Sequence, residues 1–268
     1  MTDPLLRIAA ALERLSPPPV TADPAAGDWF VFGGAGLAAV PPPRTTPLAL
    51  YAGVDSQKAQ LAENARRHAA GLPSHDVLLW GARGMGKSSL VRAVHAGLVA
   101  AGADVALVQL GRPDLQHLPQ LFSRLAATPR RFTVFLDDLS FEGDEGAVHA
   151  LRSLLDGGVM ARPDHVRLVV TSNRRNLVPR NTVDDAATNP RDAADDQLAL
   201  ADRFGLRLGF HACDQAEFLQ MCANYAGAHG LAFNPGAALS WATGRGARSG
   251  RVAWQFTVET AGAAGMSL

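Results

Sequence analysis

One glycine-rich octapeptide constrains this chain more than any other stretch. Residues 81–88 read Gly-Ala-Arg-Gly-Met-Gly-Lys-Ser; they follow the apolar run 76–80 and precede residues 89–95, whose apolar positions repeat at helical spacing. A strand, a glycine loop and a helix in this order are typical of the phosphate cradle G-x-x-x-x-G-K-[ST]. Glycines let successive backbone N–H groups converge on phosphate oxygens, and the helix adds the positive end of its dipole. The octapeptide therefore predicts a nucleotide-binding loop.

Individual residues of this loop have distinct expected roles. The Lys87 ammonium is expected to reach the β- and γ-phosphates, and the Ser88 hydroxyl to ligate Mg²⁺. The expected contacts to the nucleotide come from consecutive positions: Gly81, Ala82, Arg83, Gly84, Met85, Gly86, Lys87, Ser88 and Ser89.

An acidic pair lies at the end of a later apolar strand. The predicted strand 131–138 ends in Asp137 and Asp138. Because ligands of open α/β sheets bind beyond the carboxyl ends of the strands, both carboxylates are expected beside the glycine loop. Asp137 would hold Mg²⁺, directly or through water, and Asp138 would orient or deprotonate the attacking water. Glu142 is a rival for positioning that water, and a turn-forming role for the two acids is the alternative.

Three further polar residues fall at the ends of predicted elements. Asn173 follows the predicted strand 165–171, where its amide can touch the γ-phosphate or the attacking water; capping the next turn is the alternative. Arg203 precedes the predicted strand 204–210 and either stabilises transition-state charge on a neighbouring subunit's nucleotide or forms a structural salt bridge. Arg251 opens the last predicted helix, from which it can point at the γ-phosphate.

Predicted strands and helices alternate from residue 51 to residue 212. The predicted strands cover residues 76–80, 103–110, 131–138, 165–171 and 204–210. Among the helices of this region, one is introduced by Asp55 or Ser56 and another is capped by Asp114. The alternation predicts an α/β fold in which a parallel five-stranded sheet is the middle of three layers.

The segments on either side of this region differ from it. In residues 1–50, a predicted accessory arm, residues 4–15 have the periodicity of an amphipathic helix and residues 29–32 form a short aromatic strand candidate. Helices are predicted after residue 213, at residues 215–228, 235–243 and 249–261. We therefore expect an arm at 1–50, a nucleotide-binding α/β domain at 51–212 and a small helical lid at 213–268.

In this order the segments resemble the motifs of the AAA+ ATPases, over about residues 51–262. In that family's terms the glycine loop looks like Walker A and the acid pair like Walker B. Asn173 looks like sensor 1, Arg203 like the arginine finger and Arg251 like sensor 2. A narrower resemblance is to a bacterial domain-of-unknown-function family, number 815. The segments that carry it are Leu79–Ser89, Asp137–Glu142, Thr171–Arg175 and Gly246–Phe256.

The resemblance to the AAA+ P-loop NTPases implies ATP and Mg²⁺ as cofactors and a homo-oligomer in which Arg203 acts in trans. It also places adenine against Leu50, Tyr51 and Val54, with the lid on the other side. The chain lacks the Asn-Lys-x-Asp segment of guanine-specific proteins, which also favours ATP. The sequence departs from the broader family pattern at Asp138, where many members have Glu; this bears on the rate of hydrolysis more than on nucleotide binding.

Composition restricts the partners. Lys and Arg together number 25, as do Asp and Glu, so no overall basic field indicates a nucleic acid, although a local patch is compatible with this balance. No stretch approaches the roughly 18 uncharged apolar residues of a membrane span, and the N-terminus lacks a signal-peptide pattern. Cys213 and Cys222 are interpreted as buried free thiols. We therefore expect a cytoplasmic protein without a membrane partner.

Three functions fit these motifs. The leading hypothesis is an ATPase that couples hydrolysis to conformational change on an unknown protein client. One alternative is a nucleotide-dependent loader or binding module with little turnover, which Asp138 and the arm at residues 1–50 favour. Another is a P-loop small-molecule kinase, for which the Arg-rich segment 174–200 would supply a mobile lid.

Overall fold

The computed structural model describes residues 3–15, 20–34, 36–139, 151, 155, 162–173 and 200–268. Glu142 lies outside these residues, as do most of residues 144–155, for which the sequence predicts a helix, and nearly all of the Arg-rich segment 174–200.

The described strands form one eight-stranded sheet in the order β1-β3-β2-β5-β6-β7-β4-β8. Their bounds are β1 Val20–Thr21, β2 Trp29–Gly33, β3 Gly36–Ala39, β4 Val77–Gly81, β5 Val105–Leu110, β6 Arg131–Leu136, β7 Val166–Ser172 and β8 Leu206–Phe210. The predicted parallel strands are β4 to β8, and β4 lies between β7 and β8. The α/β fold is confirmed, whereas the predicted count of five strands is wrong for the whole sheet.

The additional strands come from the arm. β2 pairs in parallel with β5, from Trp29 opposite Leu107 to Phe32 opposite Leu110, and β3 runs antiparallel to β2. Alternate residues of β2 face opposite sides of the sheet, so Phe30 and Phe32 are buried on the same side. The arm is thus an extension of the central sheet, because its aromatic strand supplies apolar side chains to the same core as β5 and β6.

Polar contacts tie the arm to the sheet. The Arg130 guanidinium, just before β6, contacts the carboxylates of Asp28 and Asp104. The Asp114 carboxylate accepts a hydrogen bond from the backbone N–H of Gly34, 2.9 Å away. Asp114 therefore does not cap a helix as predicted; it lies within the 3-10 helix η2 (Arg112–His117), and the N-cap of α4 (Leu118–Leu125) is His117.

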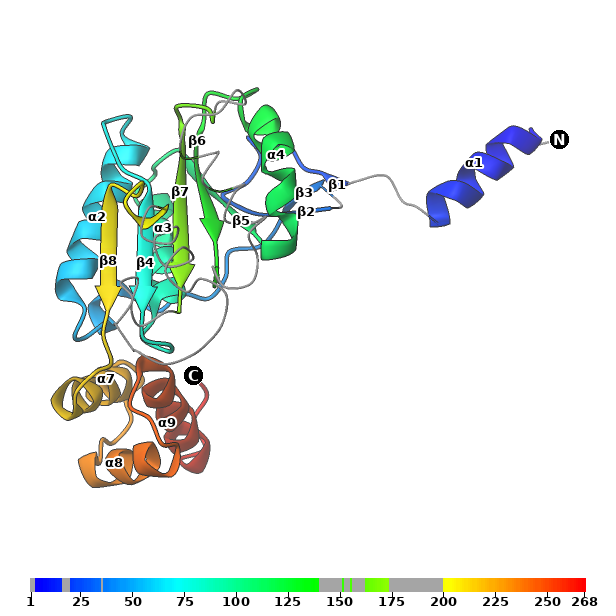
Figure 1. The fold of residues 1–268 in the computed structure, drawn as a ribbon. Coiled ribbons are helices and arrows are strands. Elements are labelled where there is room, and N and C mark those ends of the chain that lie inside the picture. The colour runs from blue at the N-terminus through cyan, green and yellow to red at the C-terminus, as the bar shows by residue number, and fades with distance from the viewer. Residues whose placement is uncertain are drawn as a thin grey trace, which may run out of the picture.

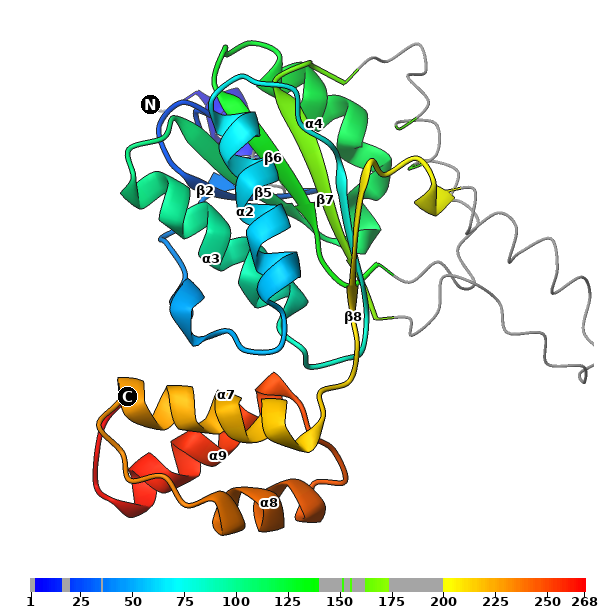
Figure 2. The same ribbon diagram turned by 90° about the vertical axis from the view of Figure 1, so that its left-hand side faces the viewer.

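Helices cover both faces of the sheet, as Figure 2 shows. Helices α2 (Asp55–Ala69) and α3 (Lys87–Ala100) lie on one face, and α4 lies on the other. Side chains of β4 alternate between the two layers: Val77 and Leu79 belong to the core beneath α2 and α3, and Leu78 to the core beneath α4. The predicted three-layer arrangement is therefore present.

The start of α2 differs from the prediction by one position. Its N-cap is Val54, without a side-chain capping bond. Asp55, predicted as a cap, is the first helical residue, and its carboxylate pairs with Lys58 at 2.7 Å. The carboxylate is thereby engaged in the first turn of the helix, three residues before its lysine partner.

Three helices follow β8 at the carboxyl ends of the parallel strands (Figure 1). They are α7 (Gln215–Ala228), α8 (Pro235–Gly244) and α9 (Gly250–Ala263). A capping box between Asp214 and Glu217 starts α7, and the Ser249 hydroxyl caps α9. Their apolar side chains continue the core that lies beneath α2 and α3.

Helix α1 (Pro4–Leu15) has the predicted bounds and lies apart from the sheet in Figure 1. In the part of the chain that the structure describes, no helix has the length and apolar character needed to span a bilayer.

Candidate nucleotide-binding site

A cavity of about 870 Å³ lies between the carboxyl ends of the parallel strands and the helices α7 and α9. The glycine loop forms its floor, at the N-terminus of α3. Sequence-predicted site residues that line it are Arg83 to Ser89, Asp137, Asp138, Asn173 and Arg251. Gly81 and Ala82 are placed beneath the loop, where their carbonyl groups hold Lys87. The motifs that were scattered along the chain thus meet at one cavity.

Two glycines of the loop occupy positions that a side chain would disturb. At Gly81, an added Cβ would lie 2.1 Å from the carbonyl oxygen of Phe210 on β8. Gly86 has φ 87°, a left-handed conformation that favours glycine, and it is the N-cap of α3. An added Cβ there would also meet the Tyr51 ring and the Ser89 hydroxyl at 3.4 Å. The left-handed conformation at Gly86 therefore turns the chain from the loop into α3.

The Lys87 ammonium is held by three acceptors. It donates to the carbonyl oxygens of Gly81 at 3.0 Å and Ala82 at 2.9 Å, and to Asn173 Oδ1 at 2.9 Å. Burial lowers the pKa of Lys87, while Asp138 and Asp137 act in the opposite direction. The residue is 5% exposed, so the cation is positioned at the base of the cavity rather than in solvent.

The Asp137 carboxylate is held on both oxygens. Oδ1 accepts hydrogen bonds from Ser88 Oγ at 2.5 Å and Thr171 Oγ1 at 2.7 Å. Oδ2 accepts one from Arg92 Nη2 at 3.0 Å. Ser88 and Asp137 thus bring two oxygen atoms together at the cavity that can serve as metal ligands. Mg²⁺ prefers oxygen ligands. These residues fit a Mg²⁺ site completed by phosphate and water oxygens.

Asp138 has an unusual backbone conformation, with φ 56°. Asp tolerates this left-handed region better than most residues, including the longer Glu. Its backbone N–H donates to Thr171 Oγ1 at 2.8 Å, and its carboxylate accepts a hydrogen bond from Asn173 Nδ2. Asn173 therefore connects Asp138 with Lys87. The local conformation gives a physical reason for Asp at this position.

Thr171 and Arg92 were not predicted as members of the site. The Thr171 hydroxyl accepts from the Asp138 backbone and donates to Asp137, so it fixes both acids. Thr171 lies on β7, two residues before Asn173, which directly follows the strand. Arg92 lies four residues after Ser88 and hence on the same face of α3. These spacings are the signals by which both residues could have been found.

The two predicted arginines lie at different places. The Arg251 backbone N–H donates to the carbonyl oxygen of Gly84 at 3.0 Å, so α9 contacts the glycine loop directly and Arg251 lines the cavity. Arg203, although described, does not line it. Arg203 precedes the five-residue strand β8, whose far end contacts Gly81. With a rise of about 3.3 Å per residue, the strand separates Arg203 from its own loop by roughly 16 Å.

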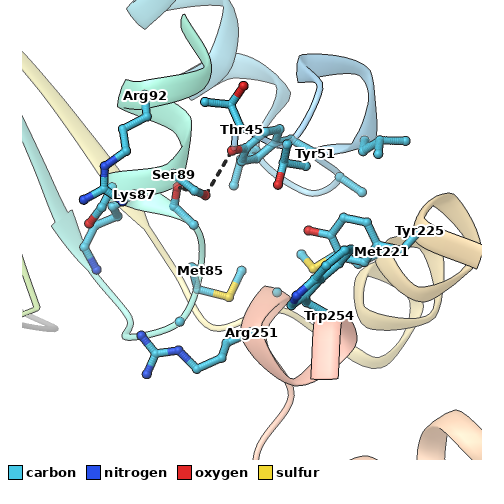
Figure 3. A pocket seen from close by; sticks show the side chains of 18 of the residues that line it. Thr45, Tyr51, Met85, Lys87, Ser89, Arg92, Met221, Tyr225, Arg251 and Trp254 are labelled. Atoms are coloured by element: carbon cyan, nitrogen blue, oxygen red, sulfur yellow. Dashed lines mark hydrogen bonds between the residues drawn. The ribbon is translucent and has the colours of Figure 1, made fainter. Parts of the chain in front are cut away.

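The other end of the cavity is aromatic (Figure 3). Tyr51 lies on the side of the sheet domain, and Met221, Tyr225 and Trp254 lie on α7 and α9. The Tyr51 hydroxyl donates to Ser89 Oγ at 2.9 Å, and burial raises the pKa of Tyr51 to about 12. The rings of Tyr225 and Trp254 meet edge to face, with centroids 5.5 Å apart.

The residues expected around adenine lie at this end. Leu50, Tyr51 and Val54 all line the cavity, and Tyr51 lies across it from Tyr225 and Trp254 in Figure 3. Apolar and aromatic walls on two sides form a slot that suits a flat base.

The sequence matches a family model over residues 25–264, the family described as protein of unknown function DUF815. Among curated proteins, no sequence relative was found.

Solved structures share the fold. A mutant form of RuvB from Thermotoga maritima is 16% identical with a TM-score of 0.54, and the match covers 84% of this chain and 69% of that chain. The ORC1 protein of Aeropyrum pernix, solved in complex with DNA, is 17% identical with a TM-score of 0.52; the match covers 75% of this chain and 57% of that chain. The chain therefore has the AAA+ fold of RuvB and ORC1.

Proposed function

Because the chain belongs to the DUF815 family and has an AAA+ fold, we propose that it binds Mg-ATP and couples its hydrolysis to conformational change on a protein client. One observation carries the proposal: Lys87, Ser88, Asp137, Asp138 and Asn173 are connected by hydrogen bonds at one cavity. The connection joins the glycine loop to the ends of β6 and β7. An ordinary strand-to-helix turn needs no such network.

Each group in the network has a role in this proposal. The loop N–H groups and Lys87 bind the phosphates, and Ser88 with Asp137 holds Mg²⁺, which neutralises phosphate charge when bound. Asp138 orients the attacking water once its carboxylate turns from Asn173 to that water. Arg251 adds a cation from α9, so loss of the γ-phosphate changes the contact between α9 and the loop.

The Asp138→Asn substitution tests the hydrolysis step. Asn tolerates the left-handed backbone and keeps an oxygen acceptor, but it cannot take a proton from water. We expect ATP binding within about threefold of wild type and a fall in phosphate release of about a hundredfold or more. Asp202→Asn, on the exposed carboxylate paired with Arg207, is the matched control. Unchanged phosphate release in Asp138→Asn would contradict the proposed role of Asp138.

The dependence of hydrolysis on protein concentration tests the role of Arg203. Since Arg203 lies at the opposite end of β8 from its own loop, we propose that it completes the site of a neighbouring copy in a homo-oligomer. Hydrolysis per molecule is then expected to rise with protein concentration. Arg203→Ala is expected to lower the maximal rate about a hundredfold or more and to leave ATP binding intact. Arg207→Ala, which removes a nearby exposed arginine, is the control. A rate independent of both concentration and Arg203 would exclude the trans role.

A binding module with little turnover is the second candidate, and the Asn173–Asp138 contact favours it. In this contact the acid is occupied by an amide that is itself held by Lys87. Tight ATP binding with phosphate release no faster than background, and capture of a client only with ATP, would support this module. Transfer of phosphate to a small acceptor instead of water would indicate a kinase.

A further inference from the structure

Asp137 forms an ion pair with a residue outside the recognised motifs. Arg92 Nη2 lies 3.0 Å from Asp137 Oδ2, and both side chains are partly buried, at 30% and 23% exposed. Figure 3 shows Arg92 extending from α3 on the side of the cavity that holds Lys87. Arg92 therefore belongs to the phosphate end of the cavity, although it is not part of the glycine loop.

The guanidinium is held in place by more than this ion pair. Arg92 Nη2 also lies 3.5 Å from Gln109 Oε1 on β5. Its Cζ lies 5.7 Å from the ring centroid of Phe135, on the strand that leads to Asp137. An aromatic face and an amide oxygen orient the guanidinium plane toward Asp137.

The ion pair and the expected Mg²⁺ site use different oxygens of Asp137. Arg92 contacts Oδ2, whereas Ser88 and Thr171 contact Oδ1. Ser88 is the expected metal ligand, so a cation beside Ser88 would lie nearer Oδ1. Arg92 and Mg²⁺ therefore do not have to exchange places at Asp137.

The charge of Arg92 affects how the acid pair acts on an entering triphosphate. A triphosphate that enters this end meets two carboxylates, Asp137 and Asp138, which repel it in a partly buried cavity. Mg²⁺ removes this repulsion when it is bound. We propose that Arg92 supplies a fixed positive charge that neutralises Asp137 in the metal-free protein, so that ATP binds before Mg²⁺ or without it. This inference rests on the proposed ATP site.

Arg92→Gln tests the proposal, because Gln keeps hydrogen-bonding groups and loses the charge. ATP affinity is measured by calorimetry in excess EDTA and again with saturating MgCl₂. The dissociation constant in EDTA divided by the dissociation constant in MgCl₂ gives a ratio that is compared between proteins. We expect the ratio to rise about tenfold in Arg92→Gln, through weaker binding in EDTA, with affinity in MgCl₂ close to wild type. Arg92→Lys, which keeps the charge, is expected to give a ratio near that of wild type.

Arg83→Gln is the matched control. Arg83 lines the same cavity, and no contact of the described structure joins it to Asp137. Removing its charge is expected to weaken binding by a similar factor in both conditions and to leave the ratio unchanged. Melting temperatures without nucleotide establish that each variant is folded. If Arg92→Gln does not fold, the ratio is measured in Asp137→Asn, where loss of the acid is expected to make binding in EDTA tighter.

The outcomes separate this inference from the proposed function. If the wild type binds no ATP even with MgCl₂, the proposed function fails. If the wild type binds ATP but the ratio is the same in Arg92→Gln and wild type, only the inference fails. Equal weakening in both conditions would also overturn it, since Arg92 would then contact the nucleotide instead of neutralising Asp137.

Discussion

The phosphate end of the cavity consists of polar side chains that bond one another, whereas the base end consists of aromatic walls with few polar contacts. At the phosphate end, Lys87 alone donates to three oxygens. At the base end, Trp254 contacts Tyr225 and His229 through ring edges and faces, and 39% of its surface stays exposed. The first end is fixed before a ligand arrives, and the second can adjust.

This difference follows the division of the chain. The phosphate end is built mainly from the glycine loop and from strand ends of a single sheet, and α9 contributes Arg251 to it. The base end is built from two separate parts, Tyr51 before α2 and Trp254 on α9, so its width depends on how α7 and α9 sit against the sheet. The larger share of the affinity is therefore expected from the first end, and the coupling of nucleotide to helix movement from the α9 residues Arg251 and Trp254.

Lys87→Ala is expected to have the largest effect. It removes the buried cation that faces the phosphates, and charge-assisted hydrogen bonds to phosphate contribute about 3 kcal/mol in total. We expect the dissociation constants of ATP and of inorganic tripolyphosphate to rise by about a hundredfold each. Both are measured by calorimetry in MgCl₂.

The matched control is Lys58→Ala, which removes the only other lysine of the chain. Lys58 pairs with Asp55 on α2 and does not line the cavity. We expect its affinity for both ligands to equal that of wild type. If Lys87→Ala bound tripolyphosphate as well as wild type does, the phosphate end would not be where we place it.

Trp254→Ala is expected to have a smaller and more selective effect. Stacking of a base on an aromatic side chain contributes about 1–3 kcal/mol, so ATP binding should weaken by about tenfold. Tripolyphosphate has no base, and its affinity is expected to stay at the wild-type value. The comparison of the two ligands in one variant thus separates the two ends of the cavity.

Trp241→Ala controls for damage to the lid helices. Trp241 lies on α8, packs at 6.3 Å from the Phe256 ring and does not line the cavity. Its loss is expected to lower the melting temperature without changing the ratio of ATP to tripolyphosphate affinity. Equal weakening of both ligands in Trp254→Ala would show that Trp254 supports the lid instead of contacting the base.

The phosphate end was largely predictable from the sequence, because its residues form short motifs at the ends of regular elements. The loop around Lys87, the acid pair and Asn173 all come together as the strand order requires. Arg92 and Thr171 were missed because each acts through another side chain, and a motif pattern records only the residues that meet the ligand.

The base end and the sheet edge were harder to predict, for a different reason. An aromatic residue such as Trp254 at helical spacing looks the same whether it fills a core or lines a cavity. The arm strand β2 depends on pairing with β5, more than seventy residues away, and local sequence carries no sign of that partner. The predicted division of the chain at residues 51 and 213 stays a prediction. Strand β2 of the arm nevertheless shares one sheet with the strands that follow residue 51.

Tyr51→Phe is expected to have the smallest effect of these substitutions. It removes one hydrogen bond, which joins the base end to the start of α3. Loss of the bond from Tyr51 to Ser89 should reduce the free energy of unfolding by about 1 kcal/mol at pH 7. Burial raises the pKa of Tyr51 to about 12, above the unfolded value of 10.0. Between these values the unfolded chain releases the proton and the folded chain keeps it, so wild-type stability falls as pH rises.

The variant has no phenol to titrate, so its disadvantage should shrink with rising pH. From pH 9 to pH 11 we expect the difference in free energy of unfolding between the two proteins to change by about 1 kcal/mol in favour of Tyr51→Phe. Urea unfolding at both pH values measures this difference. If the difference in free energy of unfolding were the same at both pH values, Tyr51 would have the same pKa in the folded and unfolded chain. The Tyr51 side of the base end would then be as open to water as the side formed by Trp254.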